Sequence, residues 1–297
     1  MNSPSNFIAE IDIALASKLK TDLEAQGFAL TKPNYTIFQA KKEGVSCTLY
    51  ESGKLMIQGK KKDDFLRFYI EPEILGNLSY SYPEVGLDTT PRIGVDEAGK
   101  GDLFGPLCIA ALYADEAMIN ELIKLGIRDS KKLNDAVILK HADAIKKLCP
   151  HSLVTIYPKK YNELYAQFKN LNSLLAWGHA TSIEELSQKT GCKKVIIDQF
   201  ASEHVVENAL SRKGLELDLS QRHRGEEDLV VAGASILARA SFVRGIDRLS
   251  DQFHTPLPKG ASALVVEAGK KFVAKHGNAP LNEVAKLHFK TIHQITS

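Results

Sequence analysis

The sequence has little cysteine, no long apolar run and no excess of one charge, and each shortage excludes a class of protein. Its four cysteines are far apart and form no C-x-x-C pair, so neither a disulfide framework nor a zinc site of that spacing is expected. No apolar stretch approaches the length of a membrane span, and "MNSPSNFIAEID" lacks the basic start and apolar core of a signal peptide. The net charge of +2 does not by itself indicate a nucleic-acid binder. We therefore expect a cytoplasmic protein without membrane association.

At 297 residues the chain is long enough for two domains with separate cores. Residues 1–78 read as a strand, a helix capped by Asp12, three further strands and a second helix; the strands are "NFIAEID", "TIFQAKK", "SCTLYES" and "KLMIQGK". This order predicts one antiparallel sheet with both helices on one face and the other face open. Glycine, proline, serine, threonine and asparagine dominate residues 76–91, so we place the interdomain linker at 79–91.

Residues 92–297 alternate apolar strands with helical patterns. The strand candidates are "RIGVDE", "LCIAALYA", "SLVTIYP", "KKVIIDQF" and "LELDLSQR". Helical patterns are expected at "AMINELIKLG", at "NDAVILKHADAIKKL" and around "YNELYAQF" and "LLAWGHATSIEELSQKTG". They are also expected through most of the remainder after the last strand, including the final stretch, "LNEVAKLHFKTIHQI". Core strands interleaved with helices predict an α/β layer fold for this second domain.

The stretch "GVDEAGKGD", residues 94–102, is one residue short of a phosphate-binding P-loop. Gly101 stands where that loop needs a serine or threonine to hold Mg²⁺. Two like unit charges about 4 Å apart repel by roughly 4 kcal/mol at an effective dielectric near 20, so Asp96 and Glu97 would oppose a bound triphosphate. We therefore expect no nucleotide cofactor, although "VIID" imitates the strand-end aspartate of such ATPases.

The same two acids favour a metal site, because clustered carboxylates are tolerated when divalent cations bridge them. Asp96 and Glu97 are expected to end a strand, where Gly99 and Gly101 let the chain turn at once. Asp198 ends a second apolar strand, and if the two strands are neighbours the three carboxylates converge at one sheet edge. A fourth acid could come from "RGEED", which contains Glu226, Glu227 and Asp228.

Three or four carboxylates without matching histidines suit Mg²⁺ or Mn²⁺, whose usual chemistry in such sites is phosphodiester hydrolysis with two ions about 3.5–4 Å apart. None of the nine histidines has the H-E-x-x-H spacing. Lys100 is placed to meet a substrate phosphate, whereas helical periodicity assigns Ser235 and Arg239 to half-buried, structural roles.

The longer string "RIGVDEAGKGDLFGPL" closely resembles the opening motif of the type 2 ribonucleases H, and its "GDLFGPL" part resembles the ribonuclease HIII branch. Further matching stretches follow in order: "RDSKKLND", "YNELYAQFKNLNSLLAWGHA", "VIIDQFAS" and "VVAGASILARASF". The amino-terminal segment is similar to the extra domain of that branch, which looks like half of a TATA-box-binding protein. The resemblance covers nearly the whole chain.

The resemblance implies a ribonuclease-H-like α/β catalytic domain, residues 92–297, preceded by a small α+β domain like the TATA-box-binding protein. It implies an endonuclease that cuts the RNA strand of RNA/DNA hybrids with Mg²⁺ or Mn²⁺, two ions per site, leaving 3′-hydroxyl and 5′-phosphate ends. We expect a monomer. The metal ligands would be Asp96, Glu97, Asp198 and Glu226, with Glu227 the nearest alternative for the last.

The expected substrate contacts are the glycine turn, two lysines of the catalytic domain and four lysines of the amino-terminal domain. The family's glycine turn appears as Gly99, Lys100 and Gly101. Further lysines would steer the phosphate backbone or contact it from the amino-terminal domain; they are Lys131, Lys132, Lys41, Lys42, Lys54 and Lys60.

Three alternatives remain open on the sequence alone. Ribonuclease HII shares the carboxylates, but the amino-terminal domain and "GDLFGPL" count against it. A non-catalytic hybrid-binding protein is disfavoured by an intact acidic set, which would repel nucleic acid without metal. A P-loop ATPase is disfavoured by Gly101.

Overall fold

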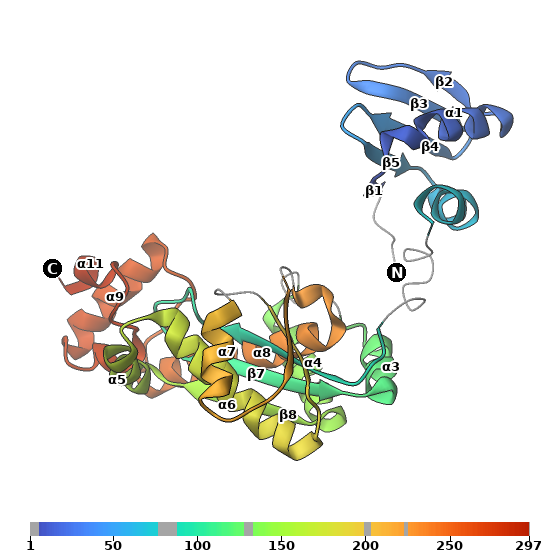
Figure 1. Ribbon diagram of the computed structural model, residues 1–297. Coiled ribbons are helices and arrows are strands. Elements are labelled where there is room, and N and C mark those ends of the chain that lie inside the picture. Colours follow the sequence, from blue (N-terminus) through green and yellow to red (C-terminus); the bar gives the residue numbers. More distant parts are fainter. Residues whose placement is uncertain (1–5, 77–87, 128–132, 199–202, 223–224, 297) are drawn as a thin grey trace. The chain divides into compact units, whose positions relative to one another are not determined.

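Two groups of strands, far apart in the sequence, form two separate five-stranded sheets (Figure 1). The computed structural model describes residues 6–76, 88–127, 133–198, 203–222 and 225–296. The chain divides into two compact units, residues 1–88 and 89–297. Most of the predicted linker, 79–91, lies outside the described residues.

The amino-terminal unit contains one antiparallel sheet of strand order β1-β5-β4-β3-β2. Its elements are β1 (Asn6–Glu10), η1 (Ile13–Leu15), α1 (Ala16–Ala25), β2 (Ala29–Thr31), β3 (Thr36–Lys42), β4 (Val45–Tyr50), β5 (Lys54–Gln58), α2 (Lys62–Phe65) and the π-helix η2 (Leu66–Leu75). The predicted strands, the helix capped by Asp12 and the second helix are confirmed. Strand β2 was not predicted, because three residues are too few to show an alternation.

Side-chain alternation divides this sheet into a buried face and an open one. Phe38 and Ala40 of β3 and Leu55 and Ile57 of β5 pack in one core with α1 and η2. The residues between them therefore point to the other face, as predicted for a sheet covered by helices on one side.

The second unit contains a mixed sheet of order β10-β9-β6-β7-β8. The strands are β6 (Arg92–Ala98), β7 (Leu107–Ala114), β8 (His151–Ile156), β9 (Lys194–Asp198) and β10 (Asp218–Arg222). Strands β10, β9 and β6 are parallel, whereas β7 and β8 are antiparallel to their neighbours. The helices are α3 (Glu116–Lys124), α4 (Asp135–Leu148), α5 (Pro158–Phe168), α6 (Leu171–Thr190), α7 (Glu203–Ser211), η4 (Gly225–Glu227), α8 (Leu229–Gln252), α9 (Ala263–His276), α10 (Leu281–Val284) and α11 (Ile292–Thr296).

Helices cover both faces of this sheet, which is why its central strands are apolar throughout. In β7, Ile109 and Ala111 join a core with α5, α6 and α7, while Ala110 and Leu112 join the opposite core with α3, α4 and α8. Helix α8 is long and apolar enough by composition to cross a membrane, but 78% of that stretch is buried inside the protein. The predicted α/β architecture is confirmed.

Two helix predictions failed. Helix α7 was missed, and the continuous helix predicted over 281–295 is wrong. After α10 the backbone instead pairs with residues 103–105: Phe104 and Ala285 form a β-bridge, and Lys286 N–H donates to the Leu103 carbonyl at 2.9 Å. A backbone hydrogen-bonded in this way cannot continue an α-helix.

Candidate active site

Strands β6 and β9 bring Asp96, Glu97 and Asp198, which we call the acidic edge, to one cavity of about 330 Å³. The expectation that β6 ends at Glu97 is wrong, because β6 runs to Ala98 and pairs with β7 to that point. Its pairing with β9, however, stops at Val95 and Ile197. The gap that opens there between two neighbouring strands lets acids on opposite faces of β6 reach the same cavity.

Asp96 points toward α8. Its carboxylate accepts a hydrogen bond from the Ser235 hydroxyl and, at 2.8 Å, from the Glu97 backbone N–H. Burial, followed by the charges of Glu97 and Asp198, raises the pKa of Asp96 to about 7 despite these hydrogen bonds. Burial and the neighbouring carboxylates therefore favour the protonated form of Asp96 unless a cation stabilises its charge.

Glu97 points the other way, toward α6. Its Oε2 accepts a hydrogen bond from His179 Nε2 at 3.1 Å, and Lys100 Nζ lies 3.5 Å from Oε1. Burial acts to raise the pKa of Glu97, but the His179 hydrogen bond and the charges of His179 and Lys100 outweigh it, so this pKa lies below its usual range. One carboxylate oxygen is thus held by α6 and the other by a lysine that also lines the cavity.

Sequence reasoning missed His179, which is fully buried. The signal was available in its helix, because His179 falls on the same buried stripe of α6 as Leu175 and Leu186. A polar residue at a core-facing position needs a partner, and here that partner is a site carboxylate.

The third carboxylate, Asp198, is held by the short helix η4. Asp198 Oδ1 accepts from Gly225 N–H at 2.8 Å, and a Cβ at Gly225 would lie 2.7 Å from Asp198 Cα. Only glycine permits so close an approach, which fixes the "GEED" turn against the acidic edge.

Of the three candidates for the fourth acid, Asp228 has a structural role. Its Oδ1 caps α8 through Val230 and Val231, and its Oδ2 forms a buried ion pair with Arg92 Nε at 2.8 Å. Glu227 is exposed. The backbone of Glu226 lies in η4, beside Asp198, and its side chain is outside the described part of the structure.

In the glycine turn (Gly99, Lys100, Gly101), the two glycines differ in whether the fold could accommodate a side chain. Gly99 has φ +86°, and a Cβ there would lie 2.2 Å from the Pro106 carbonyl oxygen. At Gly101 a Cβ would meet none of the surrounding atoms that the structure describes within 4 Å. The fold requires the first glycine, whereas the second leaves open space beside the cavity.

Two residues assigned to structural roles by periodicity, Ser235 and Arg239, line the cavity. Arg239 also donates to the Leu133 carbonyl at 2.8 Å, which ties α8 to the start of α4. Lys131 and Lys132 lie just before that point, outside the described residues.

The amino-terminal lysines do not share one face. Lys41 and Lys54 alternate with buried core residues and so belong to the open face of their sheet. Lys42 points to the opposite face, where its Nζ donates to the Gln26 carbonyl at 2.7 Å. Lys60 is exposed in the segment after β5.

The donors of the acidic edge fit a hard divalent cation. They are carboxylate oxygens, and a bound cation would favour the ionised form of Asp96, whose pKa is raised by burial and by the neighbouring carboxylates. Among the described residues, no three such side chains already form a complete ligand set. A bound cation would offset the repulsion between these carboxylates.

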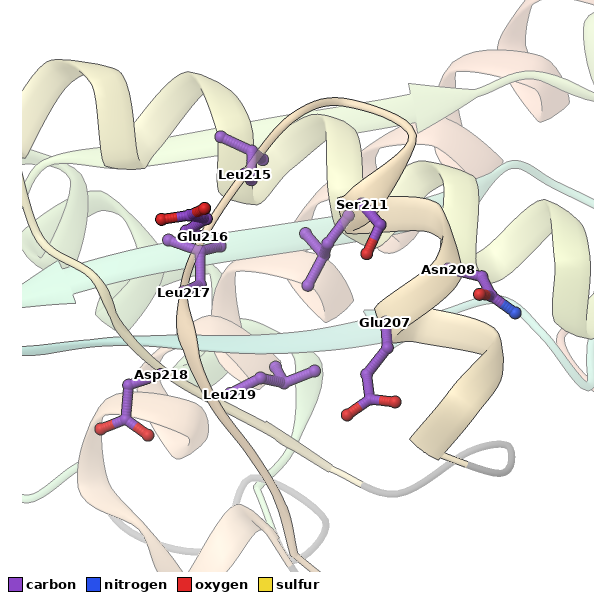
Figure 2. A pocket seen from close by; sticks show the side chains of 9 residues that line it. Glu207, Asn208, Ser211, Leu215, Glu216, Leu217, Asp218 and Leu219 are labelled. Atoms are coloured by element: carbon purple, nitrogen blue, oxygen red, sulfur yellow. The ribbon is translucent and has the colours of Figure 1, made fainter.

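A wider cavity, of about 740 Å³, lies between α7 and the segment leading into β10 (Figure 2). Leucines such as Leu215, Leu217 and Leu219 alternate there with the acids Glu216 and Asp218. The described part of this cavity's lining contains no lysine and no glycine turn. Although this cavity is larger than the one at the acidic edge, it therefore does not share that site's composition.

The fold and the acidic edge define the class of the ribonuclease-H-like hydrolases. A family model described as ribonuclease HII matches residues 93–292, and one described as a domain of unknown function (DUF3378) matches residues 6–75. The chain is 52% identical to the ribonuclease HIII of Protochlamydia amoebophila and 49% identical to that of Chlamydia felis, in each case over 99% of this chain and 98% of the relative. The chain belongs to the ribonuclease HIII family, and the enzyme is a ribonuclease H.

Solved structures of similar proteins cover nearly the whole chain. A crystal structure of Bst-RNase HIII in complex with Mn²⁺ is 29% identical, with a TM-score of 0.69 and 98% of each chain covered. The structure of Aquifex aeolicus RNase H3 is 27% identical, with a TM-score of 0.57, and covers 96% of this chain and 100% of that one. The two-unit architecture of this enzyme is therefore similar to that of solved members of its family.

Proposed function

We propose that the enzyme hydrolyses the RNA strand of RNA/DNA hybrids with two divalent ions, Mg²⁺ or Mn²⁺, and leaves 3′-hydroxyl and 5′-phosphate ends. The observation that carries the proposal is the acidic edge, where three carboxylates share one cavity and the pKa of Asp96 is raised to about 7. The Mn²⁺ bound to Bst-RNase HIII supports the choice of metal. We propose a monomeric, cytoplasmic enzyme.

Asp96, Glu97 and Asp198 would hold the ions, with Glu226 as the proposed fourth ligand. The bound ions would activate the attacking water and stabilise the 3′-oxygen as it leaves. His179 would orient Glu97 by binding Oε2, which leaves Oε1, the oxygen beside Lys100, for an ion.

Lys100 has two partners in this mechanism. It lies 3.5 Å from Glu97 Oε1, where it supplies a positive charge beside the carboxylate. When a cation takes over that role, the lysine can bind a phosphate of the hybrid. Arg239 lines the same cavity, and Lys131 and Lys132 would add positive charge along the nucleic-acid backbone.

The glycine turn would contact the ribose of the RNA strand. Gly101 faces open space, so backbone can approach the sugar closely there. A backbone contact with the 2′-hydroxyl would allow the enzyme to distinguish RNA from DNA.

We propose that residues 1–78 form a substrate-binding domain, joined by the linker 79–91 to a catalytic domain of residues 92–297. Two rows of facing residues cross the open face: Ile8, Met56, Thr48, Gln39 and Thr31, then Asn6, Gln58, Ser46, Lys41 and Ala29. The exposed amides, hydroxyls and lysines of this face can hydrogen-bond sugar and phosphate without reading sequence. Thr48 is buried, and its hydroxyl accepts from Gln39 Nε2 at 3.0 Å. Lys41, Lys54 and Lys60 remain proposed phosphate contacts, whereas Lys42 is directed to the other face.

The test is cleavage of a hybrid labelled on either strand, with and without Mg²⁺ or Mn²⁺, by the parent enzyme and by Asp96→Asn. We expect metal-dependent cutting of the RNA strand alone, lost in the variant while hybrid binding persists. A duplex with a single embedded ribonucleotide is the comparison substrate. Tight binding without cleavage under either metal would contradict the proposal.

A further inference from the structure

Lys286 is a lysine with no exposed surface, at the carboxyl-terminal end of the chain. Its ammonium nitrogen donates to the carbonyl oxygens of Asp102 at 2.8 Å and Gly105 at 2.7 Å. It also lies 5.7 Å from the centre of the Tyr161 ring. Burial lowers the pKa of Lys286 to about 8, although the charge of Asp102 acts against that shift. A buried ammonium is unfavourable in itself, so its two carbonyl contacts are its principal compensation.

These two carbonyls bracket the segment that directly follows the glycine turn. The same segment is held by two backbone hydrogen bonds with residues 284–286: Gly105 N–H donates to the Val284 carbonyl, and Lys286 N–H donates to the Leu103 carbonyl. Together they make the β-bridge between Phe104 and Ala285. On another side, Gly260 N–H donates to Asp102 Oδ1 at 2.6 Å, and Leu103 N–H donates to the Gly260 carbonyl at 2.9 Å. The path of residues 102–105 is thus determined by groups more than 150 residues away in sequence.

Lys286 is held in turn by its own neighbourhood. Asn162 of α5 donates to the Ala285 carbonyl at 3.0 Å and accepts from Leu287 N–H at 2.9 Å. An apolar residue of similar length would fill the space of Lys286, but it would leave two carbonyls without their donor. A role in core packing alone would be met by an apolar side chain and does not explain a lysine at this position. Hydrogen bonding to both carbonyls does explain it.

We propose that Lys286 is a positioning residue, which fixes the glycine turn beside the acidic edge through the carbonyls of Asp102 and Gly105. The carboxyl-terminal segment, residues 281–289, is then part of the active-site architecture although it contributes no group to the cavity lining. The inference rests on the proposed function of the glycine turn in placing the RNA strand. Lys286 acts on substrate geometry and not on the carboxylates, which are carried by β6 and β9.

The experiment compares Lys286→Met with Ile295→Ala, a variant that removes a core side chain packed against Gly269 of α9. Ile295 belongs to α11, which lies beside α9 (Figure 1). Each is assayed for thermal unfolding, Mn²⁺ affinity, and KM and kcat on a hybrid. For Lys286→Met we expect kcat to fall about tenfold or more, with KM and Mn²⁺ affinity within about threefold of the parent. For Ile295→Ala we expect kcat within about twofold, even where its loss of thermal stability is as large.

Lys286→Gln provides a second variant, because it keeps an N–H donor on a shorter side chain. It should recover part of the kcat lost in Lys286→Met, and it decides the question alone if the methionine variant does not fold. If Lys286→Met and Lys286→Gln both fold and neither has a kcat below that of Ile295→Ala, the inference is wrong. A parent enzyme that cuts no hybrid would instead contradict the proposed function, so the two failures are distinguishable.

Discussion

Alanine in place of each glycine of the glycine turn should separate folding from substrate binding. At Gly99 an alanine would adopt φ +86°, and its Cβ would lie 2.2 Å from the Pro106 carbonyl oxygen and 2.9 Å from the Phe242 ring. The left-handed backbone costs about 1–2 kcal/mol, and the overpacking adds about 1–3 kcal/mol. Gly99→Ala should therefore lower the free energy of unfolding by about 2–5 kcal/mol, which in a domain of this size lowers Tm by roughly 4–20 °C.

Gly101→Ala should behave in the opposite way. Its backbone is outside the left-handed region, and around its Cβ the described structure has no atom within 4 Å, so we expect a stability change within about 0.5 kcal/mol. The added methyl group would occupy the space that we propose for the ribose, so single-turnover cleavage of a hybrid should fall about tenfold or more.

Thermal unfolding followed by circular dichroism, together with single-turnover cleavage, checks both variants. A loss of stability in Gly101→Ala as large as that in Gly99→Ala would refute the reasoning. Cleavage of the hybrid by Gly101→Ala at the parental rate would refute it equally.

Three further predictions concern the acidic edge and the open sheet. Because the pKa of Asp96 is raised to about 7, the folded state binds more protons than the unfolded state between about pH 4 and pH 7, and its stability falls as pH rises through that window. Asp96→Asn should therefore stabilise the metal-free protein by about 2–4 kcal/mol at pH 8, with less gain toward pH 4. Denaturant unfolding measures this, and a less stable variant at pH 8 would count against it. His179→Leu removes the hydrogen bond that orients a site carboxylate and should weaken Mn²⁺ binding about 10- to 100-fold by calorimetric titration; parental affinity would exclude that role. Replacing Lys41 and Lys54 together by glutamine should make the slope of log binding constant against log salt concentration shallower by roughly two for hybrid binding. Lys20→Gln, an exposed control on α1, should leave that slope unchanged. Equal slopes for the double variant and the parent enzyme would show that the open face is not part of the interface.

The acidic edge could be predicted from sequence because its acids stand at the ends of apolar strands. Acids brought together there repel one another unless a cation binds them, so their clustering indicates a metal site. Asp96 and Glu97 precede a glycine turn, and Asp198 follows "VII". The sequence did not show that β6 continues to Ala98, nor that its pairing with β9 ends early and opens the cavity. Register between strands a hundred residues apart is a tertiary property.

Several features were missed or left open because long-range contacts decide them. The helix predicted over 281–295 fails because residues 284–286 pair with residues 103–105, and helical periodicity gives no sign of that partner. His179 and Lys286 are polar residues on otherwise apolar patterns, and their partners are 82 residues away in one case and 184 and 181 in the other. Asp228 looked equivalent to its neighbours in "RGEED" until its pairing with Arg92, 136 residues away, showed a structural role.

The most direct test of two-metal catalysis at the acidic edge is to locate Mn²⁺ by anomalous diffraction in crystals of the parent enzyme bound to a product hybrid. We expect two ions about 3.5–4 Å apart, coordinated by Asp96, Glu97 and Asp198, with Glu226 completing the set. Manganese bound elsewhere, or a single ion that does not contact these carboxylates, would contradict the proposed mechanism.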